Sequence, residues 1–417
     1  MKSEIIAVGS EMLTPFRQDT NSLYLTEKLN ELGVTVTFKT IVGDRRKDLL
    51  NALHSALART DIVVLMGGLG PTEDDLTREA VAEALSLTLR RDASQVSALA
   101  ARAASWRMPM PQNNMKQADV LEGATILPNP NGSAPGQWLD TTYAGYRKLL
   151  MLVPGPPNEC RPLFDAECIP RLRELLPPAA IAKRTLRAAM IPESQADKLL
   201  APIYTTYTDV ETTILAKPGD IQLTLLCSKS SAEAARARVD ELAGRMEEAL
   251  EDWFYSSGNE SSESLEQIVL YYLGLRQSTL AVAESCTGGM IAERITRVPG
   301  SSRSFLGGAI VYSNEMKTAL AGVAPELIDE HGAISQEVAE ALATGIRQHT
   351  GATLGLGVTG IAGPSGGSEA KPVGLVYIAL SDGVKTDLVK RTFPGDRDRI
   401  RQWAAQQALD LIRLKLR

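Results

Sequence analysis

Short apolar runs alternate along the first part of the chain with segments whose leucines recur every three or four positions. Residues 5–8, 34–42 and 61–66 are apolar or rich in β-branched side chains, which predicts strands. Residues 22–32 carry leucines at helical spacing and are followed by Gly33, a residue that commonly ends helices. A second helical pattern is made by Leu49, Leu50, Leu53 and Leu57. This order predicts βαβ units around a mostly parallel sheet.

The alternation is interrupted by turn-forming segments that suggest domain boundaries. Prolines gather at residues 154–157 and at Pro177-Pro178, and a polar segment at 259–264 has the composition of a linker. A chain of 417 residues is too long for one ordinary core. We therefore expect three α/β domains, which span residues 1–172, 173–256 and 257–417.

Composition narrows the classes of partner. The 44 basic and 50 acidic side chains give a net charge of -6, which favours neither nucleic acid nor anionic lipid as a partner. Four cysteines without a CxxC pair and only three histidines leave few ligands for structural zinc and fit a reduced compartment. No run of 18 apolar residues occurs. We expect a cytoplasmic protein without membrane contact, and a homodimer on general grounds of symmetry.

A glycine-containing loop follows an apolar strand pattern in the last third of the chain. Residues 279–283 are strand-like, Glu284-Ser285-Cys286-Thr287-Gly288-Gly289 follows, and residues 290–295 are helical in pattern. Such a turn would present Ser285 at the edge of a sheet, with glycines that admit a ligand and helix amides that face an anion. An ordinary strand-to-helix turn is the alternative.

A lysine follows the next strand pattern. Residues 305–311 are strand-like, and Lys317 comes shortly afterwards. A serine hydroxyl needs a base, and a desolvated lysine can serve as one. Lys317 is the candidate base for Ser285, because no histidine lies near either motif. Two alternatives remain: Lys317 as a solvated lysine at a helix start, and Cys286 as the nucleophile.

A third loop, at residues 359–368, is dense in glycine and follows the apolar residues 354–358. It is expected to wrap closely around a ligand. Arg397 and Arg399 then begin the last helical pattern, where a guanidinium can bind phosphate through two hydrogen bonds. For both arginines a solvated helix face is the alternative.

The N-terminal part contains a comparable loop at residues 67–77. Its glycines can cradle phosphate, and its carboxylates can bind a hard cation. Alternatively, Thr72 or Asp74 merely caps the following helix. Glu11 follows the first strand pattern and could supply a further oxygen ligand, and a small-residue loop contains Asn131.

Several motifs together resemble the C-terminal domain of the CinA family. They are ESCTGG at 284–289, PGSS at 299–302, YSNEMK at 312–317, HGAISQEVA at 331–339, TGIAGPSGGSEAKPVG at 359–374 and GDRD at 395–398. That domain is the nicotinamide-nucleotide amidase, a hydrolase of the pyridine nucleotide cycle. The resemblance implies that nicotinamide mononucleotide is deamidated to nicotinate mononucleotide and ammonia, without a cofactor.

The same resemblance implies roles for individual residues. Ser285 would be the nucleophile and Lys317 the base. Residues expected to bind the substrate are Thr287, Gly288, Gly289, Ser302, Tyr312, Thr359, Gly360, Gly363 and Arg397.

The N-terminal blocks resemble the CinA domain that has the three-layer fold of molybdopterin-binding proteins. This implies an ADP-ribose pyrophosphatase that uses a divalent metal, held by Glu11 and Asp75. Residues expected to bind the nucleotide are Gly67, Gly68, Gly70, Asp75 and Asn131. The chain departs from the family at Pro15, where a glycine is usual and where proline removes an amide donor, and at Cys160, where methionine is usual.

The middle part resembles the family's small KH-like connector, from which we infer no RNA binding. Two other functions stay open. In one, the N-terminal domain is the enzyme and the C-terminal domain senses a nucleotide. In the other, the chain is a non-enzymatic adaptor in competence or DNA damage.

Overall fold

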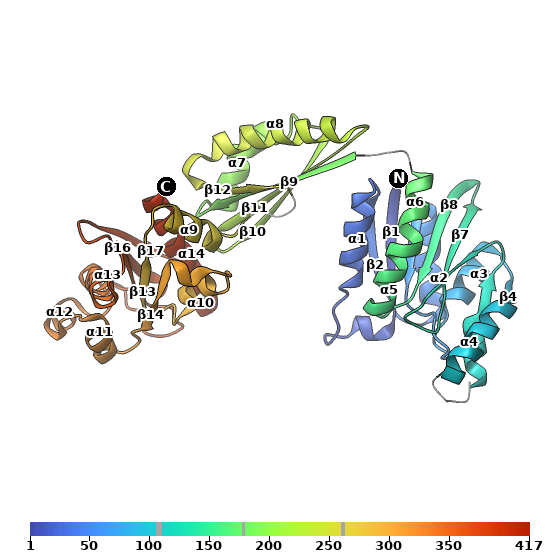
Figure 1. Cartoon of the computed structure of the whole chain (residues 1–417), viewed down its shortest axis with the longest axis horizontal. Helices are drawn as coiled ribbons and strands as arrows, with labels where there is room; N and C mark the ends of the chain where they lie inside the picture. The colour runs from blue at the N-terminus through green and yellow to red at the C-terminus, as the bar shows by residue number, and fades with distance from the viewer. Residues whose placement is uncertain (106–110, 177–179, 260–262) are drawn as a thin grey trace. The chain divides into compact units, whose positions relative to one another are not determined.

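The computed structural model describes residues 1–105, 111–176, 180–259 and 263–417 (Figure 1). It contains two compact units. The first comprises Met1–Ile181 with Ser228–Ala232, and the second comprises Ala182–Cys227 with Glu233–Arg417. Pro177 and Pro178, and residues 260–262 of the expected linker, lie outside the described residues. The expected domain boundaries stay predictions.

The first unit is built on a six-stranded sheet in the order β2-β1-β3-β8-β7-β6. Neighbours from β2 to β8 are parallel, and β7 and β6 are added antiparallel. The strands are β1 (Lys2–Val8), β2 (Thr35–Val42), β3 (Ile62–Met66), β6 (Thr125–Leu127), β7 (Gly136–Tyr143) and β8 (Tyr146–Val153). A separate pair consists of β4 (Leu89–Arg91) and β5 (Asp119–Leu121). The predicted mostly parallel sheet is confirmed.

Helices cover both faces of this sheet, which gives three layers. They are α1 (Asn21–Glu31), α2 (Arg46–Arg59), α3 (Thr77–Leu85), α4 (Ala93–Ser105), α5 (Pro157–Leu163) and α6 (Ile169–Leu175). Side chains alternate between faces along a strand, so Ile5 packs with Leu25 of α1 while its neighbour Ile6 packs with Leu53 of α2. The expected three-layer architecture is confirmed.

The second unit begins with a small four-stranded sheet in the order β10-β11-β9-β12. Its elements are β9 (Ala180–Ala189), α7 (Glu193–Tyr204), β10 (Val210–Lys217), β11 (Asp220–Lys229), α8 (Ala232–Leu250) and β12 (Phe254–Gly258). Leu200 of α7 and Leu242 of α8 are fully buried with Leu223 and Leu225 of β11, which alternate with less buried residues along that strand. This is the expected small α/β module.

A five-stranded sheet in the order β14-β13-β15-β16-β17 forms the remainder of the unit. Its strands are β13 (Leu280–Glu284), β14 (Phe305–Ile310), β15 (Leu354–Gly360), β16 (Leu375–Ser381) and β17 (Thr386–Thr392). Strands β14, β13 and β15 are parallel, so their carboxyl ends meet at one edge. Strand β16 is antiparallel to β15, and β17 is antiparallel to β16. Open α/β sheets bind ligands at such an edge.

Helices cover this sheet on both faces as well. They are α9 (Leu265–Leu275), α10 (Met290–Thr296), α11 (Asn314–Ala321), α12 (Pro325–His331), α13 (Gln336–Thr350) and α14 (Arg397–Leu416). Val282 of β13 packs toward α9, α10 and α14, while the adjacent Ala283 packs toward α11, α12 and α13. The short strand β13 is therefore enclosed on both faces.

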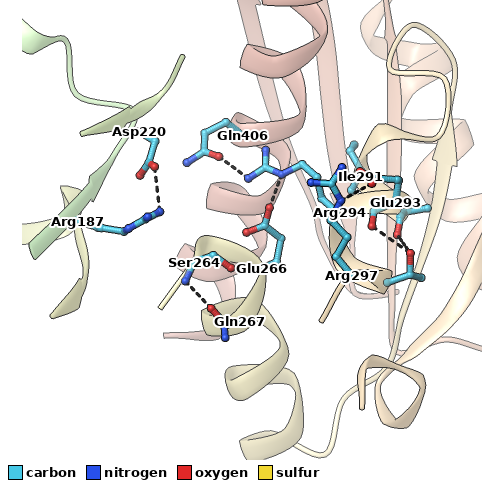
Figure 2. Close-up of polar contacts among 12 residues, drawn as sticks. Arg187, Asp220, Ser264, Glu266, Gln267, Ile291, Glu293, Arg294, Arg297 and Gln406 are labelled. Carbon is cyan, nitrogen blue, oxygen red and sulfur yellow. Dashed lines mark hydrogen bonds and ion pairs between the residues drawn. The ribbon is translucent and has the colours of Figure 1, made fainter. Parts of the chain in front are cut away.

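Polar contacts join the three helices on the first of these faces. Arg294 of α10 forms an ion pair with Glu266 of α9 and donates a hydrogen bond of 2.7 Å to the Oε1 of Gln406 on α14 (Figure 2). Further along α14, the buried Arg413 donates to the carbonyl of Phe254 at the start of β12. These contacts tie α10 to α9 and α14, and α14 to β12.

In the described part of the chain, no helix is long and apolar enough to cross a membrane.

Candidate active site

The carboxyl ends of β13, β14 and β15 border a cavity of about 170 Å³. Its walls come from the turn after β13, the start of α11, the turn between α12 and α13, the end of β15, and the start of α14. The lining residues are Ser285, Cys286, Tyr312, Asn314, Lys317, Ala333, Ile334, Thr359, Gly360, Ala362 and Arg397. The fold therefore brings together Ser285, the predicted nucleophile, and Lys317, the predicted base.

Ser285 lies in the tight turn between β13 and α10. Its amide donates to the carbonyl of Val358 on β15 at 3.0 Å, and its own carbonyl accepts a hydrogen bond from the amide of Gly288. Gly288 and Gly289 have φ values of 59° and 90°, in the left-handed region that suits glycine. The amides of Cys286 and Thr287 donate to no backbone carbonyl among the described residues. This turn thus holds Ser285 on the cavity wall with two backbone donors beside it.

Lys317 is buried, with 2% of its surface exposed, so the alternative of a solvated lysine is wrong. Its Nζ donates to the backbone carbonyls of Val311, Tyr312 and Ser313 at 3.1, 3.4 and 3.5 Å. Burial lowers the pKa of Lys317 below the usual lysine value, against smaller opposing effects of Cys286 and Glu315. A lowered pKa raises the fraction of neutral amine, the form that can accept a proton.

Cys286 also lines the cavity, but its thiol is packed into the hydrophobic core. Burial raises the pKa of Cys286 to about 12. At neutral pH the thiol therefore stays protonated, and a thiol is a much weaker nucleophile than a thiolate. This electrostatic environment favours Ser285 over Cys286.

Arg397 and Tyr312 meet at the exposed side of the cavity. The Arg397 Nη1 donates to the carbonyl of Gly363 and the Nη2 donates to the hydroxyl of Tyr312, each at 2.8 Å. Thr359 donates through its hydroxyl to the carbonyl of Ala333 at 2.7 Å, which ties the end of β15 to the turn before α13. Arg397 is exposed, yet it is anchored at the cavity rather than being only part of a solvated helix face.

Helix α10 does not offer its first amides to a ligand, contrary to the expectation from the sequence. The carboxylate of Glu284, which is 1% exposed, accepts hydrogen bonds from the amides of Gly289, Ile291 and Ala292. Helices α11 and α14 are capped as well, by Ser313 and Asp396. These side chains occupy the positions that an anion would take at a helix start.

Some predicted substrate-binding residues are not part of the cavity lining. They are Thr287, Gly288, Gly289, Ser302 and Gly363. Gly363 contributes its carbonyl to Arg397, whereas Ser302 lies in the 3₁₀ turn Ser301–Arg303 before β14. The binding roles of all five stay predictions.

Reasoning from the sequence missed Asn314, Ala333, Ile334 and Ala362 as lining residues. Asn314 belongs to the YSNEMK segment that supplied Tyr312 and Lys317, so its position in that segment was an available signal. Ala333 and Ile334 lie in a turn whose apolar residues carry no chemical signal, and only the packing of α12 and α13 brings them to the cavity.

The first unit has a larger cavity of about 550 Å³ at the carboxyl ends of β1, β3 and β8. Five of the predicted residues line it: Glu11, Gly67, Gly68, Gly70 and Asp75. Asn131 is not among the lining residues, because it lies in a loop where its Nδ2 donates to the carbonyl of Asn158 at 3.0 Å. The role of Asn131 in nucleotide binding stays a prediction.

The start of α3 holds the glycine loop of this cavity in place. The hydroxyl of Thr77 donates to the carbonyl of Gly67 at 2.7 Å, and the buried Arg78 donates to the carbonyls of Leu69 and Gly70 at 2.9 and 3.2 Å. Since α3 begins at Thr77, the alternative that Thr72 or Asp74 caps this helix is wrong.

Asp75 acts within this loop, where its Oδ2 accepts hydrogen bonds from the amide and the hydroxyl of Thr72 at 2.9 and 2.6 Å. Glu11 and Asp75 border the same cavity, but the described residues contain no group of three or more His, Cys, Asp or Glu side chains that could hold a metal ion. These two carboxylates alone would fit only a cation that takes its other ligands from phosphate and water.

Three family models match successive parts of the chain. They are the probable molybdopterin binding domain at residues 4–174, the damage-inducible protein CinA KH domain at residues 183–256, and the CinA C-terminal domain at residues 262–416.

Whole-length relatives are similar as well. The chain is 64% identical to a CinA-like protein of Acidobacterium capsulatum and 56% identical to one of Koribacter versatilis, in each case over 416 residues that cover 100% of both chains. It is 48% identical to a CinA-like protein of Solibacter usitatus, with 100% of this chain and 98% of that one covered.

Proposed function

This chain belongs to the CinA family, and from that premise we propose that its C-terminal domain hydrolyses the carboxamide of nicotinamide mononucleotide to give nicotinate mononucleotide and ammonia. The observation that best supports this proposal is that Ser285, directly after β13, and Lys317, on the helix α11 that follows the neighbouring strand β14, border one cavity. A serine beside a buried lysine is a known arrangement for amide hydrolysis.

The reaction proceeds through an acyl-enzyme. Neutral Lys317 takes the proton of the Ser285 hydroxyl as the serine oxygen attacks the carboxamide carbon. The amide of Cys286, a residue that borders the cavity, stabilises the resulting oxyanion. Lys317 then gives its proton to the leaving nitrogen, and ammonia departs. Water attacks the ester with Lys317 again as base, and nicotinate mononucleotide is released as Ser285 regains its proton.

The walls of the cavity suit the two ends of this substrate. Ala333, Ile334 and Ala362 provide apolar surface for the pyridine ring near Ser285. Arg397 is exposed and therefore accessible to the phosphate, which a guanidinium binds with charge-assisted hydrogen bonds. Because α10, α11 and α14 have capped first turns, Arg397 is the group assigned to the phosphate.

The test is ammonia release from nicotinamide mononucleotide by the purified full chain, without added metal, compared with Ser285→Ala, Lys317→Ala and Cys286→Ala. The proposal predicts that the first two variants lose activity and that the third retains it. Absence of ammonia with folded wild-type protein would contradict the proposal and direct attention to the nucleotide-sensor or adaptor functions.

We propose a second activity, the cleavage of ADP-ribose to AMP and ribose 5-phosphate, for the N-terminal domain. The supporting observation is the large cavity bordered by the glycine loop 67–70 and by Asp75. Loss of ADP-ribose cleavage in Asp75→Ala, with ammonia release unchanged, is the expected result. Ammonia release that falls in parallel would contradict two independent sites.

A further inference from the structure

Glu284 directly precedes Ser285, and its carboxylate is bonded to the helix that follows. The Oε2 accepts hydrogen bonds from the amides of Gly289 and Ile291 at 3.0 and 3.1 Å, and the Oε1 accepts one from Ala292 at 2.8 Å. Amides in the first turn of a helix have no partner inside the helix, and a negative charge is favourable there. Among the described residues no ion pair of Glu284 is found, and these three amides surround its buried carboxylate.

The backbone of Glu284 is held as firmly as its side chain. As the last residue of β13, it pairs with Ile310 of β14 and with Val358 of β15. Its carbonyl accepts a hydrogen bond of 2.8 Å from the amide of Val311. The backbone of Glu284 therefore fixes the start of the turn at 285–288 to the sheet. Its carboxylate fixes the end of this turn, because it binds the first amides of α10.

On the basis of the proposed amidase function, we propose that Glu284 is a positioning residue for Ser285. By binding the first turn of α10, it sets the path of the turn between β13 and the helix. It thereby orients the Ser285 hydroxyl for attack and the amide of Cys286 for oxyanion binding. Glu284 does not line the cavity and acts only through these groups.

Glu266 provides a matched comparison. It is also a carboxylate with little exposure, at 9%, and it also holds α10, through the side chain of Arg294 (Figure 2). Arg294 lies near the far end of the helix, whereas Glu284 binds the turn that adjoins Ser285. If Glu284 only stabilised the packing of α10, substitution of either glutamate would have the same kind of effect on catalysis.

The experiment compares Glu284→Gln with Glu266→Gln in the full chain. Glutamine keeps one acceptor oxygen but turns the other into an amide donor, which cannot bind a backbone amide. For Glu284→Gln we expect kcat to fall about 100-fold, the effect of a small misplacement of reacting groups. The KM for nicotinamide mononucleotide and the midpoint of the pH profile should stay unchanged. Glu266→Gln should lower the melting temperature and leave kcat as in the wild type.

Two further measurements do not depend on turnover of the nucleotide. Amide hydrogen exchange at residues 286–292 should accelerate in Glu284→Gln but not in Glu266→Gln. Labelling of Ser285 by a serine-reactive fluorophosphonate should slow in Glu284→Gln only. If Glu284→Gln does not fold, Glu284→Asp, which keeps the charge but shortens the side chain, replaces it in all three measurements.

The outcomes separate this inference from the proposed function. Wild-type protein that releases no ammonia contradicts the amidase proposal, while the labelling of Ser285 still decides the role of Glu284. Active wild-type protein with unchanged kcat and labelling in Glu284→Gln would overturn the positioning role. Equal losses of kcat in both glutamate variants would overturn it too, because general destabilisation of α10 would then account for the effect.

Discussion

The Arg397 guanidinium donates a hydrogen bond of 2.8 Å to the hydroxyl of Tyr312, which lies 85 residues earlier in the chain. This contact joins the start of α14 to the short connection between β14 and α11, across the exposed side of the C-terminal cavity. A second hydrogen bond, to the carbonyl of Gly363, fixes the plane of the guanidinium. The cation is therefore already oriented before a ligand arrives, which reduces the entropy lost on binding.

Arg397→Lys should weaken recognition of the phosphate, since an ammonium cannot replace the planar guanidinium contacts. We expect the KM for nicotinamide mononucleotide to rise about tenfold, which corresponds to about 1.4 kcal/mol. The KM for nicotinamide riboside, which lacks the phosphate, should not change. Steady-state kinetics with both substrates measures this, and Arg399→Lys is the control at a neighbouring exposed arginine. Equal increases for both substrates would contradict phosphate binding by Arg397.

Lys317→Arg should abolish the base while keeping the positive charge, because arginine stays protonated in proteins. Loss of a general base typically costs a factor of about 10² to 10⁴, which we expect in kcat. The control is Lys371→Arg, at a lysine whose Nζ also donates to a backbone carbonyl, that of His331, but which does not line the cavity. Ammonia release is the measurement, and an active Lys317→Arg would exclude Lys317 as the base.

The pH dependence should report the neutral form of Lys317. Below its pKa the ammonium cannot accept the serine proton, so kcat/KM should rise with pH through a midpoint below the usual lysine value of 10.5. The exposed Glu315 raises the pKa of Lys317, so Glu315→Gln should move the midpoint to lower pH. A midpoint that moves to higher pH would contradict this assignment.

Cys286→Ala should leave kcat within about threefold of the wild type, because the substitution keeps the backbone amide that is proposed to bind the oxyanion. Burial raises the pKa of the Cys286 thiol to about 12, so iodoacetamide at pH 8 should leave this cysteine unmodified. Mass spectrometry of the treated protein, together with ammonia release, tests both statements. Rapid alkylation of Cys286 with loss of activity would restore the cysteine as a candidate nucleophile.

Arg78→Leu should destabilise the glycine loop of the first unit. The substitution leaves the buried carbonyl of Leu69 and the partly buried carbonyl of Gly70 without their donor, at a cost of about 2–4 kcal/mol. Faster hydrogen exchange at residues 67–76 and loss of ADP-ribose cleavage are the expected results, with ammonia release as the unaffected control. Unchanged exchange in this segment would show that Arg78 does not hold the loop.

Strand positions were predictable because buried parallel strands leave an unmistakable apolar pattern. The expected strand at residues 279–283 corresponds to β13, and Gly33 follows α1 as predicted. Motif order then placed Ser285 and Lys317 after neighbouring strands, and the parallel arrangement of β13 and β14 brings strand ends to one edge.

The parts that could not be predicted depend on where side chains point after packing. The sequence around Glu284 does not reveal that its carboxylate binds the first turn of α10. A glutamate side chain at the end of a strand could equally extend into solvent. Ile334 reaches the cavity only through the packing of α12 against α13. Burial of Lys317 likewise follows from the packing of α11 and not from its own position in the sequence.

The capped starts of α10, α11 and α14 have an evolutionary consequence. Because the chain's own side chains already occupy these helix starts, the proposed function assigns attraction of an anionic ligand to Arg397 and bond cleavage to Ser285 and Lys317 on other elements. Selection can therefore change the charge of the accepted ligand by one substitution at the start of α14. The groups proposed to cleave the amide would be inherited unaltered by such a descendant.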